Sequence, residues 1–241
     1  MKIESLTNQK VKQWVKLQTK KGRDASQQFI VEEEHLIIEA LKYNIVDTIL
    51  YIEENPFGFE KAIQVSVSVM KKLSSNVSLV RYMAICHKQE LPIKNFQRLL
   101  LLDEIQDPGN LGTIIRSAKS FGFDGIYLSN KSVDLYNDKC IRSSQGAFIN
   151  FPIIRTELLP IMQQLKKAKV QIVGTSLQQA VSLETLVCQP QMAFVIGNEG
   201  QGVSAEVLKQ CDVIVKIPMK NFESLNAGIA ASILMYEYRN I

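Results

Sequence analysis

The fold is decided by residues 193–238, AFVIGNEGQGVSAEVLKQCDVIVKIPMKNFESLNAGIAASILMYEY. Short apolar runs alternate there with polar segments rich in Gly, Ser and Asn, a pattern that predicts strands and helices joined by loops. Closely spaced glycines let backbone amides approach a ligand without interference from a Cβ atom. The expected elements are a strand at 193–196, a glycine-rich loop at 197–202, a short helix capped by Ser204, a strand at 213–217 that Pro218 ends, a loop at 219–225 and a helix at 226–238.

The loops at 197–202 and 219–225 each follow a strand, and we expect both at the carboxyl edge of a parallel sheet. Open α/β folds bind their ligands at that edge. A glycine-rich loop by itself fits an ordinary turn with helix caps equally well. The glycine spacing G-x-x-G-x-G differs from the G-x-G-x-x-G of dinucleotide-binding folds, which argues against a doubly wound, nucleotide-binding oxidoreductase.

Composition indicates a globular protein of one or two domains. The chain has 241 residues, of which 46% are hydrophobic and 22% charged, and its formal net charge of +4 permits an anionic partner without requiring one. It has no apolar run of roughly 18 residues, so no membrane span is expected. The four cysteines lie far apart and only two histidines are present, so we expect no metal site and scattered thiols in a reducing cytoplasm.

Alternating strands and helices also precede this stretch. Residues 99–103 form an apolar strand, and the helix expected at 111–121 has Asn110 well placed as its N-cap. The alternation predicts an α/β domain over 97–241 with a mostly parallel sheet. Its other expected elements are strands at 125–128, 151–154 and 170–174, a helix at 158–167 and a loop at 140–147.

The first 90 residues predict a smaller α/β domain that ends near Ala84, with the polar segment 87–96 as linker. Residues 1–24 are expected to form a helix with one packed side and one basic side. This basic side is either a phosphate-binding surface or a solvated face. The remaining expected elements are strands at 29–31, 45–52 and 65–67 and helices at 32–41 and 70–73.

Three motifs carry a family resemblance: DPGNLG at 107–112 followed by RSA at 116–118, IGNEG at 196–200, and IPM at 217–219 followed by ESLN at 223–226. In this order they resemble the SpoU (TrmH-like) branch of the SPOUT RNA methyltransferases. The resemblance implies a deep C-terminal trefoil knot, which pattern reading would not propose. Residues 3–41 resemble the L30e-like substrate-binding domain that precedes many SpoU domains, except that Glu33 stands where that family usually has Gly.

The resemblance implies a reaction and a cofactor. The reaction is methyl transfer from S-adenosylmethionine to a ribose 2′-hydroxyl of RNA, with ribosomal RNA favoured over tRNA by the extra domain. A non-catalytic RNA-binding protein is the alternative from another class. Relatives are homodimers, and the apolar residues of the last helix, Ile229, Ile233, Leu234, Tyr236 and Tyr238, favour the same assembly. The implied cofactor-binding residues are Thr175, Gly197, Gly200, Ile217, Met219 and Leu225, although a turn residue and ordinary core residues fit the same pattern.

Arg116 resembles the family's catalytic arginine. Arginine stays protonated in proteins and is therefore a poor base, so binding a phosphate and stabilising alkoxide charge is the favoured role, and a surface ion pair is the alternative. The other implied catalytic residues are Asn110, Glu199, Ser224 and Asn226, with Glu199 equally interpretable as a structural cap. The chain departs from the family at Asn221 and at Ala227–Gly228. The expected RNA-binding residues are Lys10, Lys12, Lys16, Lys20, Lys21, Arg23 and Arg142, the last also interpretable as a structural ion pair.

Overall fold

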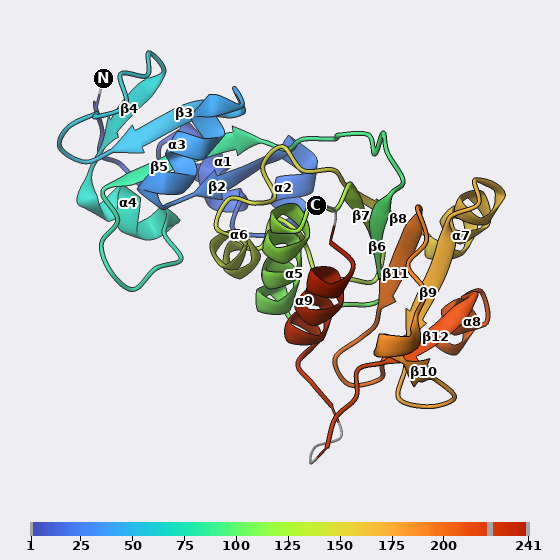
Figure 1. Ribbon diagram of the computed structural model, residues 1–241. Helices are drawn as coiled ribbons and strands as arrows, with labels where there is room; N and C mark the ends of the chain where they lie inside the picture. Colours follow the sequence, from blue (N-terminus) through green and yellow to red (C-terminus); the bar gives the residue numbers. More distant parts are fainter. Residues whose placement is uncertain (1, 221–223, 240–241) are drawn as a thin grey trace. The chain divides into compact units, whose positions relative to one another are not determined.

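A computed structural model describes residues 2–220 and 224–239 of the chain (Figure 1). The chain divides into two compact units. The first comprises residues 1–89 together with 136–141, and the second comprises residues 90–135 and 142–241. Residues 136–141 fall within the second domain expected from the sequence, yet they belong to the first compact unit.

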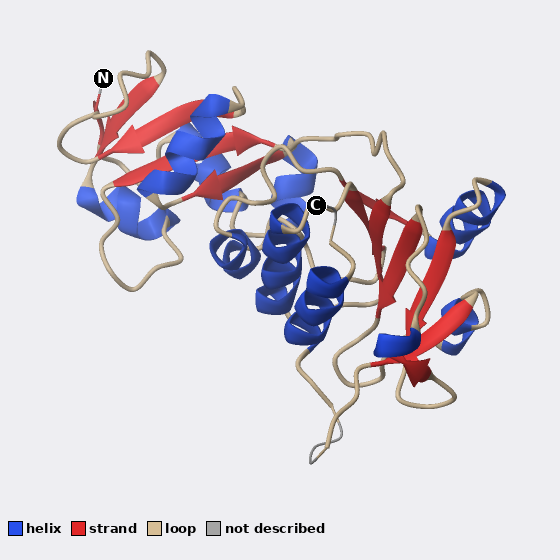
Figure 2. Ribbon diagram, in the orientation of Figure 1, coloured by secondary structure: helices blue, strands red, loops and turns tan. Residues whose placement is uncertain are grey.

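The first unit is built on a five-stranded mixed sheet with strand order β1-β4-β3-β5-β2. Figure 2 shows the strands of the protein in red and its helices in blue. Strands β1 and β3 run parallel to β4, whereas β5 is antiparallel to both β3 and β2. Helices α1 and α4 pack their buried residues into one core with the sheet. The elements are β1 (Lys2–Ile3), α1 (Gln9–Lys16), α2 (Lys20–Ser26), β2 (Gln28–Val31), α3 (Glu34–Lys42), β3 (Val46–Tyr51), β4 (Ala62–Val65), α4 (Val67–Leu73) and β5 (Tyr82–His87).

The basic segment forms two helices rather than the single expected one. Thr19 is extended and its side chain accepts a hydrogen bond from the Gly22 amide, so it caps a new helix. A Cβ at Gly22 would lie 1.9 Å from the Lys16 carbonyl oxygen, and the tight corner therefore requires glycine. The strand expected at 65–67 is wrong beyond Val65, because Ser66 caps α4 through the Val69 amide.

The second unit contains a seven-stranded sheet of order β10-β12-β9-β11-β6-β7-β8, and every described pair is parallel. This confirms the predicted sheet, while the trefoil knot stays a prediction. Helices α5 and α9 lie side by side on one face, and α7 and α8 lie on the other (Figure 1). The elements from residue 98 onward are β6 (Arg98–Leu102), α5 (Pro108–Ser120), β7 (Gly125–Ser129), α6 (Asp138–Ser144), β8 (Ile153–Thr156), α7 (Leu158–Lys167), β9 (Gln171–Thr175), β10 (Val181–Ser182), a 3-10 turn (Leu183–Thr185), β11 (Met192–Ile196), α8 (Ala205–Leu208), β12 (Val213–Lys216) and α9 (Ala227–Glu237). Residues 138–141 of α6 belong to the first unit.

The strand order brings several loops to one edge of the sheet. Strand β11 lies between β6 and β9, and β12 pairs with β9 on its other side. Because all four strands are parallel, the segments that follow them meet at the carboxyl edge, as the sequence predicts. Helix α6 replaces the loop expected at 140–147. No helix in the described part of the chain is long and apolar enough to cross a membrane.

Candidate active site

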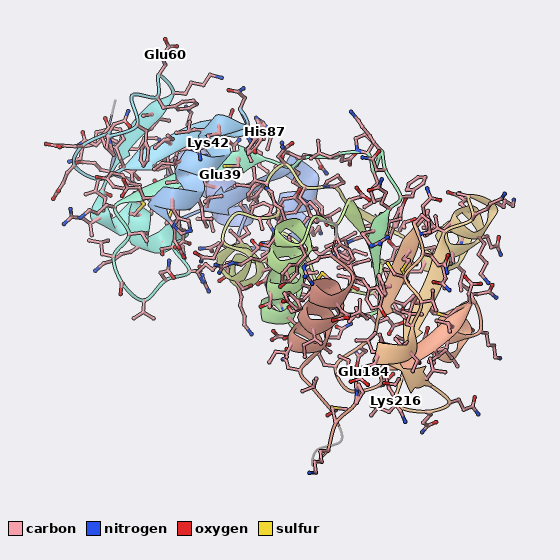
Figure 3. All side chains as sticks on the ribbon, viewed as in Figure 1. Glu39, Lys42, Glu60, His87, Glu184 and Lys216 are labelled. Carbon is pink, nitrogen blue, oxygen red and sulfur yellow. The ribbon has the colours of Figure 1, made fainter. Side chains whose placement is uncertain are left out.

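A pocket of about 750 Å³ opens at this carboxyl edge. Its walls come from the segments after β6, β9, β11 and β12 and from the start of α9. Glu199 and Ser224 line the pocket, as does Lys216 at the end of β12 (Figure 3). All of the expected cofactor-binding residues line it as well: Thr175, Gly197, Gly200, Ile217, Met219 and Leu225.

The glycine-rich loop is held closed on itself. Asn198 and Gly202 exchange backbone hydrogen bonds of 3.0 and 2.9 Å. The Asn198 side chain accepts from the Gly200 amide at 2.8 Å and donates to the Glu104 carbonyl at 2.9 Å. A Cβ at Gly197 would lie 2.1 Å from backbone atoms of Gly202 and Val203, so only glycine fits there.

Thr175 has an anchoring role as well as a place on the pocket wall. Its Oγ1 donates to the Val195 carbonyl at 2.8 Å, which links the end of β9 to β11. The hydroxyl therefore fixes the spacing of two strands whose following loops form the pocket. This contact is compatible with Thr175 as an ordinary structural residue. It is also compatible with Thr175 as a cofactor-binding residue, since the residue lines the pocket.

A connected set of polar side chains stands beside the pocket. The Asn110 side-chain amide donates to Glu199 Oε1 at 2.9 Å, and its oxygen accepts from the Asn226 amide at 2.8 Å. Asn226 in turn caps α9, since its oxygen accepts from the Gly228 and Ile229 amides. The expected catalytic residues Asn110, Glu199 and Asn226 thus form one chain of hydrogen bonds that joins the first turn of α5, the glycine-rich loop and the N-cap of α9.

Asn110 does not cap its helix, contrary to the expectation from the sequence. Asp107 is the N-cap of α5, and its carboxylate accepts from the Asn110 backbone amide at 2.9 Å. Pro108 occupies the first helical turn, where its missing N–H costs nothing. The helix therefore begins earlier than expected, and the Asn110 side chain is turned to Glu199 and Asn226 instead of capping the helix.

Glu199 is both a cap and an orienting group. Its carboxylate accepts from the backbone amides of Gln106 and Asp107 at 3.1 and 3.0 Å and from Asn110. Burial alone would raise the pKa of this carboxyl, but the hydrogen bonds from the Asn110 side chain and the two backbone amides lower it overall. Glu199 is therefore an ionised acceptor whose lone pairs are already engaged, which is unsuitable for a general base.

This pKa shift predicts the acid response of a Glu199→Gln variant. A carboxyl with a lowered folded pKa adds stability above its unfolded pKa of about 4.3, and that stability is lost as the pH falls through the folded value. The stability advantage of the wild type over the variant should be constant above about pH 5 and shrink below about pH 4. Urea unfolding at a series of pH values measures it. An advantage that stayed constant down to about pH 3 would contradict the assignment.

Arg116 lies apart from the pocket. It is exposed on α5, about 9 Å along the helix axis from Asn110, and it does not line the pocket. Within the described residues it makes no ion pair, so nothing there supports the alternative of a surface salt bridge. Ser224 lines the pocket and is exposed, whereas Asn221 and Glu223 lie outside the described residues. Ala227 and Gly228, the other departure from the family, are buried at the start of α9.

The basic residues of the first unit separate into two groups. The five expected lysines, Lys10, Lys12, Lys16, Lys20 and Lys21, are all exposed. Arg23 is instead only 7% exposed, and its guanidinium donates to the Leu17 carbonyl at 2.8 Å. The expectation that Arg23 belongs to the basic surface is therefore corrected. Its side chain is buried at the corner between α1 and α2 and holds that corner through the Leu17 carbonyl. Arg142, the expected RNA-binding residue of the second unit, is half-buried near the end of α6.

Sequence reasoning missed two side chains that shape the site. The Asp103 carboxylate, 5% exposed, accepts from the Ser204 amide at 2.9 Å, and Ser204 makes no side-chain cap of its own. Asn198 ties the glycine-rich loop to Glu104. The available signal for Asp103 was an acidic residue directly after the apolar run 99–102. Among the described residues, no group of three or more His, Cys, Asp or Glu side chains is placed to hold a metal ion.

The chain is similar to known methyltransferases along its whole length. The SpoU rRNA methylase family model matches residues 97–236, and the MRM3-like substrate binding domain model matches residues 8–78. The chain is 38% identical to 23S rRNA (guanosine(2553)-2′-O)-methyltransferase RlmP of Bacillus subtilis over 98% of both chains.

Solved structures give the same result. An AdoMet-bound rRNA methyltransferase from Sinorhizobium meliloti superposes with a TM-score of 0.88 at 27% identity, over 99% of this chain and 97% of that one. The SpoU methyltransferase AviRb from Streptomyces viridochromogenes, in complex with AdoMet, gives 0.85 at 25% identity, over 96% and 97%. With a family model matched across the second unit and a relative aligned over nearly all of the chain, this protein belongs to the SpoU rRNA methylase family.

Proposed function

We propose that this protein transfers a methyl group from S-adenosylmethionine to a ribose 2′-hydroxyl of ribosomal RNA. The observation that carries the proposal is the hydrogen-bonded set Asn110–Glu199–Asn226 beside the pocket. The substrate class follows from the relative in Bacillus subtilis, whose name specifies 23S rRNA and whose alignment includes the first unit. An enzyme with this substrate works where ribosomal RNA is found, so the proposal includes a cytoplasmic location.

The pocket suits S-adenosylmethionine in size and lining. Its volume of about 750 Å³ lies within the range of roughly 300–1,000 Å³ usual for small-molecule sites. Ile217, Met219 and Leu225 offer apolar walls for the adenine. Backbone groups can approach the ligand at Gly197, where no Cβ intervenes. The cofactor supplies a methyl group already activated by the positive sulfonium.

The protein's own residues position the acceptor. Asn110 and Asn226 are held by each other and by Glu199, so their orientation is fixed before RNA arrives. The exposed guanidinium of Arg116 binds the phosphate next to the target ribose and stabilises the negative charge that develops on the 2′-oxygen. This role needs no imidazole, and neither His35 nor His87 lines the pocket.

The test replaces the proposed nucleophile. An RNA carrying a single 2′-deoxy substitution at the methylated nucleotide should bind as the unmodified RNA does, because the phosphate contacts remain. It should accept no methyl group from labelled S-adenosylmethionine. Methylation of the deoxy RNA would place the methyl group on a base, and an unmodified RNA that is bound but never methylated would assign the protein a non-catalytic role.

The exposed lysines predict a salt-dependent affinity for RNA. Replacing Lys12, Lys16, Lys20 and Lys21 with Gln should weaken RNA binding and reduce the slope of log K against log salt, by up to about 0.9 for each phosphate that these lysines neutralise. Filter binding between low and moderate salt measures the slope. S-adenosylmethionine affinity should not change, and an unaltered slope would leave these lysines as a solvated face.

Helix α9 predicts a homodimer. Ile229, Ile233 and Tyr236 are 53%, 39% and 55% exposed on this helix, an apolar stripe that a partner would cover. Leu234 and Tyr238, also expected at an interface, are instead core residues of the same chain. Ile233→Asp should convert a dimer into a monomer by light scattering at micromolar concentration. Val187→Asp, at an exposed valine elsewhere, is the control that should stay dimeric; a monomeric wild type would contradict the prediction.

A further inference from the structure

One loop of the first unit, residues 74–79, is anchored by a single carboxylate. Glu32 Oε1 accepts from the Ser75 amide at 2.8 Å and from its hydroxyl at 3.2 Å. Glu32 Oε2 accepts from the Ser74 hydroxyl at 2.8 Å and from the Asn76 side-chain amide at 2.7 Å. Hydrogen bonds to an ionised group are stronger than neutral ones, so this set holds the loop in one shape.

The anchored loop presents apolar side chains to solvent. Val77 is fully exposed, at 108% of the reference value, and Leu79 is 48% exposed. A single exposed apolar residue is ordinary on a protein surface. Here, however, the fully exposed valine directly follows three residues that Glu32 fixes in place, and its side chain is not buried in the core.

The charged residues that flank the loop in the sequence are all positive. Residues 62–89 contain no Asp or Glu. Lys71, Lys72 and Arg81 are exposed, and none is ion-paired within the described residues. The Gln18 side chain donates to the Lys72 and Leu73 carbonyls at 2.8 and 3.2 Å, and this fixes the end of α4 against the basic corner between α1 and α2.

We propose that loop 74–79 is an RNA-binding element in which Val77 packs on an unpaired base and Lys71, Lys72 and Arg81 contact the flanking phosphates. The inference rests on the RNA substrate proposed above. Proteins recognise RNA mainly at unpaired bases, whose faces pack against side chains. The segment 62–89, which contains the loop, carries basic residues and no Asp or Glu, and this composition suits a polyanion. Glu32 acts as a positioning residue, because both of its carboxylate oxygens accept hydrogen bonds from the loop.

The apolar and electrostatic contributions are separable by mutation of the full-length protein. Val77→Ala removes the apolar contact without changing charge and should weaken binding of unmodified 23S rRNA transcript about tenfold, with an unchanged salt slope. Lys71→Gln with Lys72→Gln should weaken binding and lower the slope. Val187→Ala, at an exposed valine of the second unit, is the matched control and should bind as the wild type does.

A footprint separates positioning from mere folding. In a chemical footprint of the bound RNA, Val77→Ala should expose one unpaired nucleotide that the wild type protects. Glu32→Ala should expose the same nucleotide, while the affinity for S-adenosylmethionine stays unchanged. If both variants bind and methylate the transcript as the wild type does, the loop proposal is overturned and the proposed function stands. If Val77→Ala fails to bind intact ribosomal subunits but binds the protein-free transcript as the wild type does, the loop contacts a protein and the RNA assignment is wrong. Failure of the wild type itself to methylate RNA counts against the proposed function instead.

Discussion

Replacing Arg116 with Ala lowers the rate of methyl transfer by at least about 10²-fold and leaves the affinity for S-adenosylmethionine unchanged. The two effects separate because Arg116 is exposed on α5 and contributes nothing to the lining of the pocket. Loss of a group that acts on developing charge raises the barrier of the chemical step without touching donor binding. Single-turnover transfer of a labelled methyl group measures the rate, and calorimetric titration measures the donor affinity.

Arg116→Lys restores little of the rate that Arg116→Ala removes. Lysine keeps the charge but lacks the planar fork that reaches two oxygens at once. Lys209→Ala, which removes an exposed cation on the other face of the sheet, controls for general charge loss and should be fully active. A fall in donor affinity that matched the fall in rate would place Arg116 in the donor site and refute its assignment to the RNA side.

The parallel sheet and the position of the pocket were predictable from sequence because they depend on short-range pattern. Apolar runs such as 99–102 and 193–196 become buried strands whenever helices cover both faces. The family motifs then named Gly197, Gly200, Ile217, Met219 and Leu225, all of which line the pocket, whereas Thr175 was placed by its position at the end of a strand. Helix starts were less predictable, since Asp107 and Asn110 are both good N-caps and only the proline at 108 favours the earlier one.

Tertiary contacts decided the remaining differences. Arg23 sits among lysines in the sequence, but the turn between α1 and α2 buries it against the Leu17 carbonyl. Strand β5 lies between β3 and β2 in the first sheet, yet its apolar run is short and leads directly into polar residues, so the pattern indicated a domain end. The structural role of Asn198 could not be predicted from the sequence, because its partners Glu104 and Gly202 meet it only once the loop has folded.

The second large effect is expected from Gly197→Ala. The added methyl group would lie 2.1 Å from the backbone of Gly202 and Val203, which cannot move aside as a side chain can. The loop must therefore shift, and overpacking of this kind costs about 1–3 kcal/mol. Because the same loop forms the pocket wall, donor affinity should fall at least tenfold, or about 1.4 kcal/mol, together with a lower melting temperature.

Gly200→Ala is the matched control within the same loop. Its added Cβ would meet nothing closer than the Asn198 side-chain oxygen at 3.6 Å, an ordinary contact. Both residues line the pocket, so a difference between the two variants isolates the backbone collision from the simple loss of glycine. Titration with S-adenosylmethionine and thermal unfolding measure both variants. Gly200→Ala should stay close to wild type, and equal losses in the two variants would mean that loop flexibility, not the close approach at Gly197, governs donor binding.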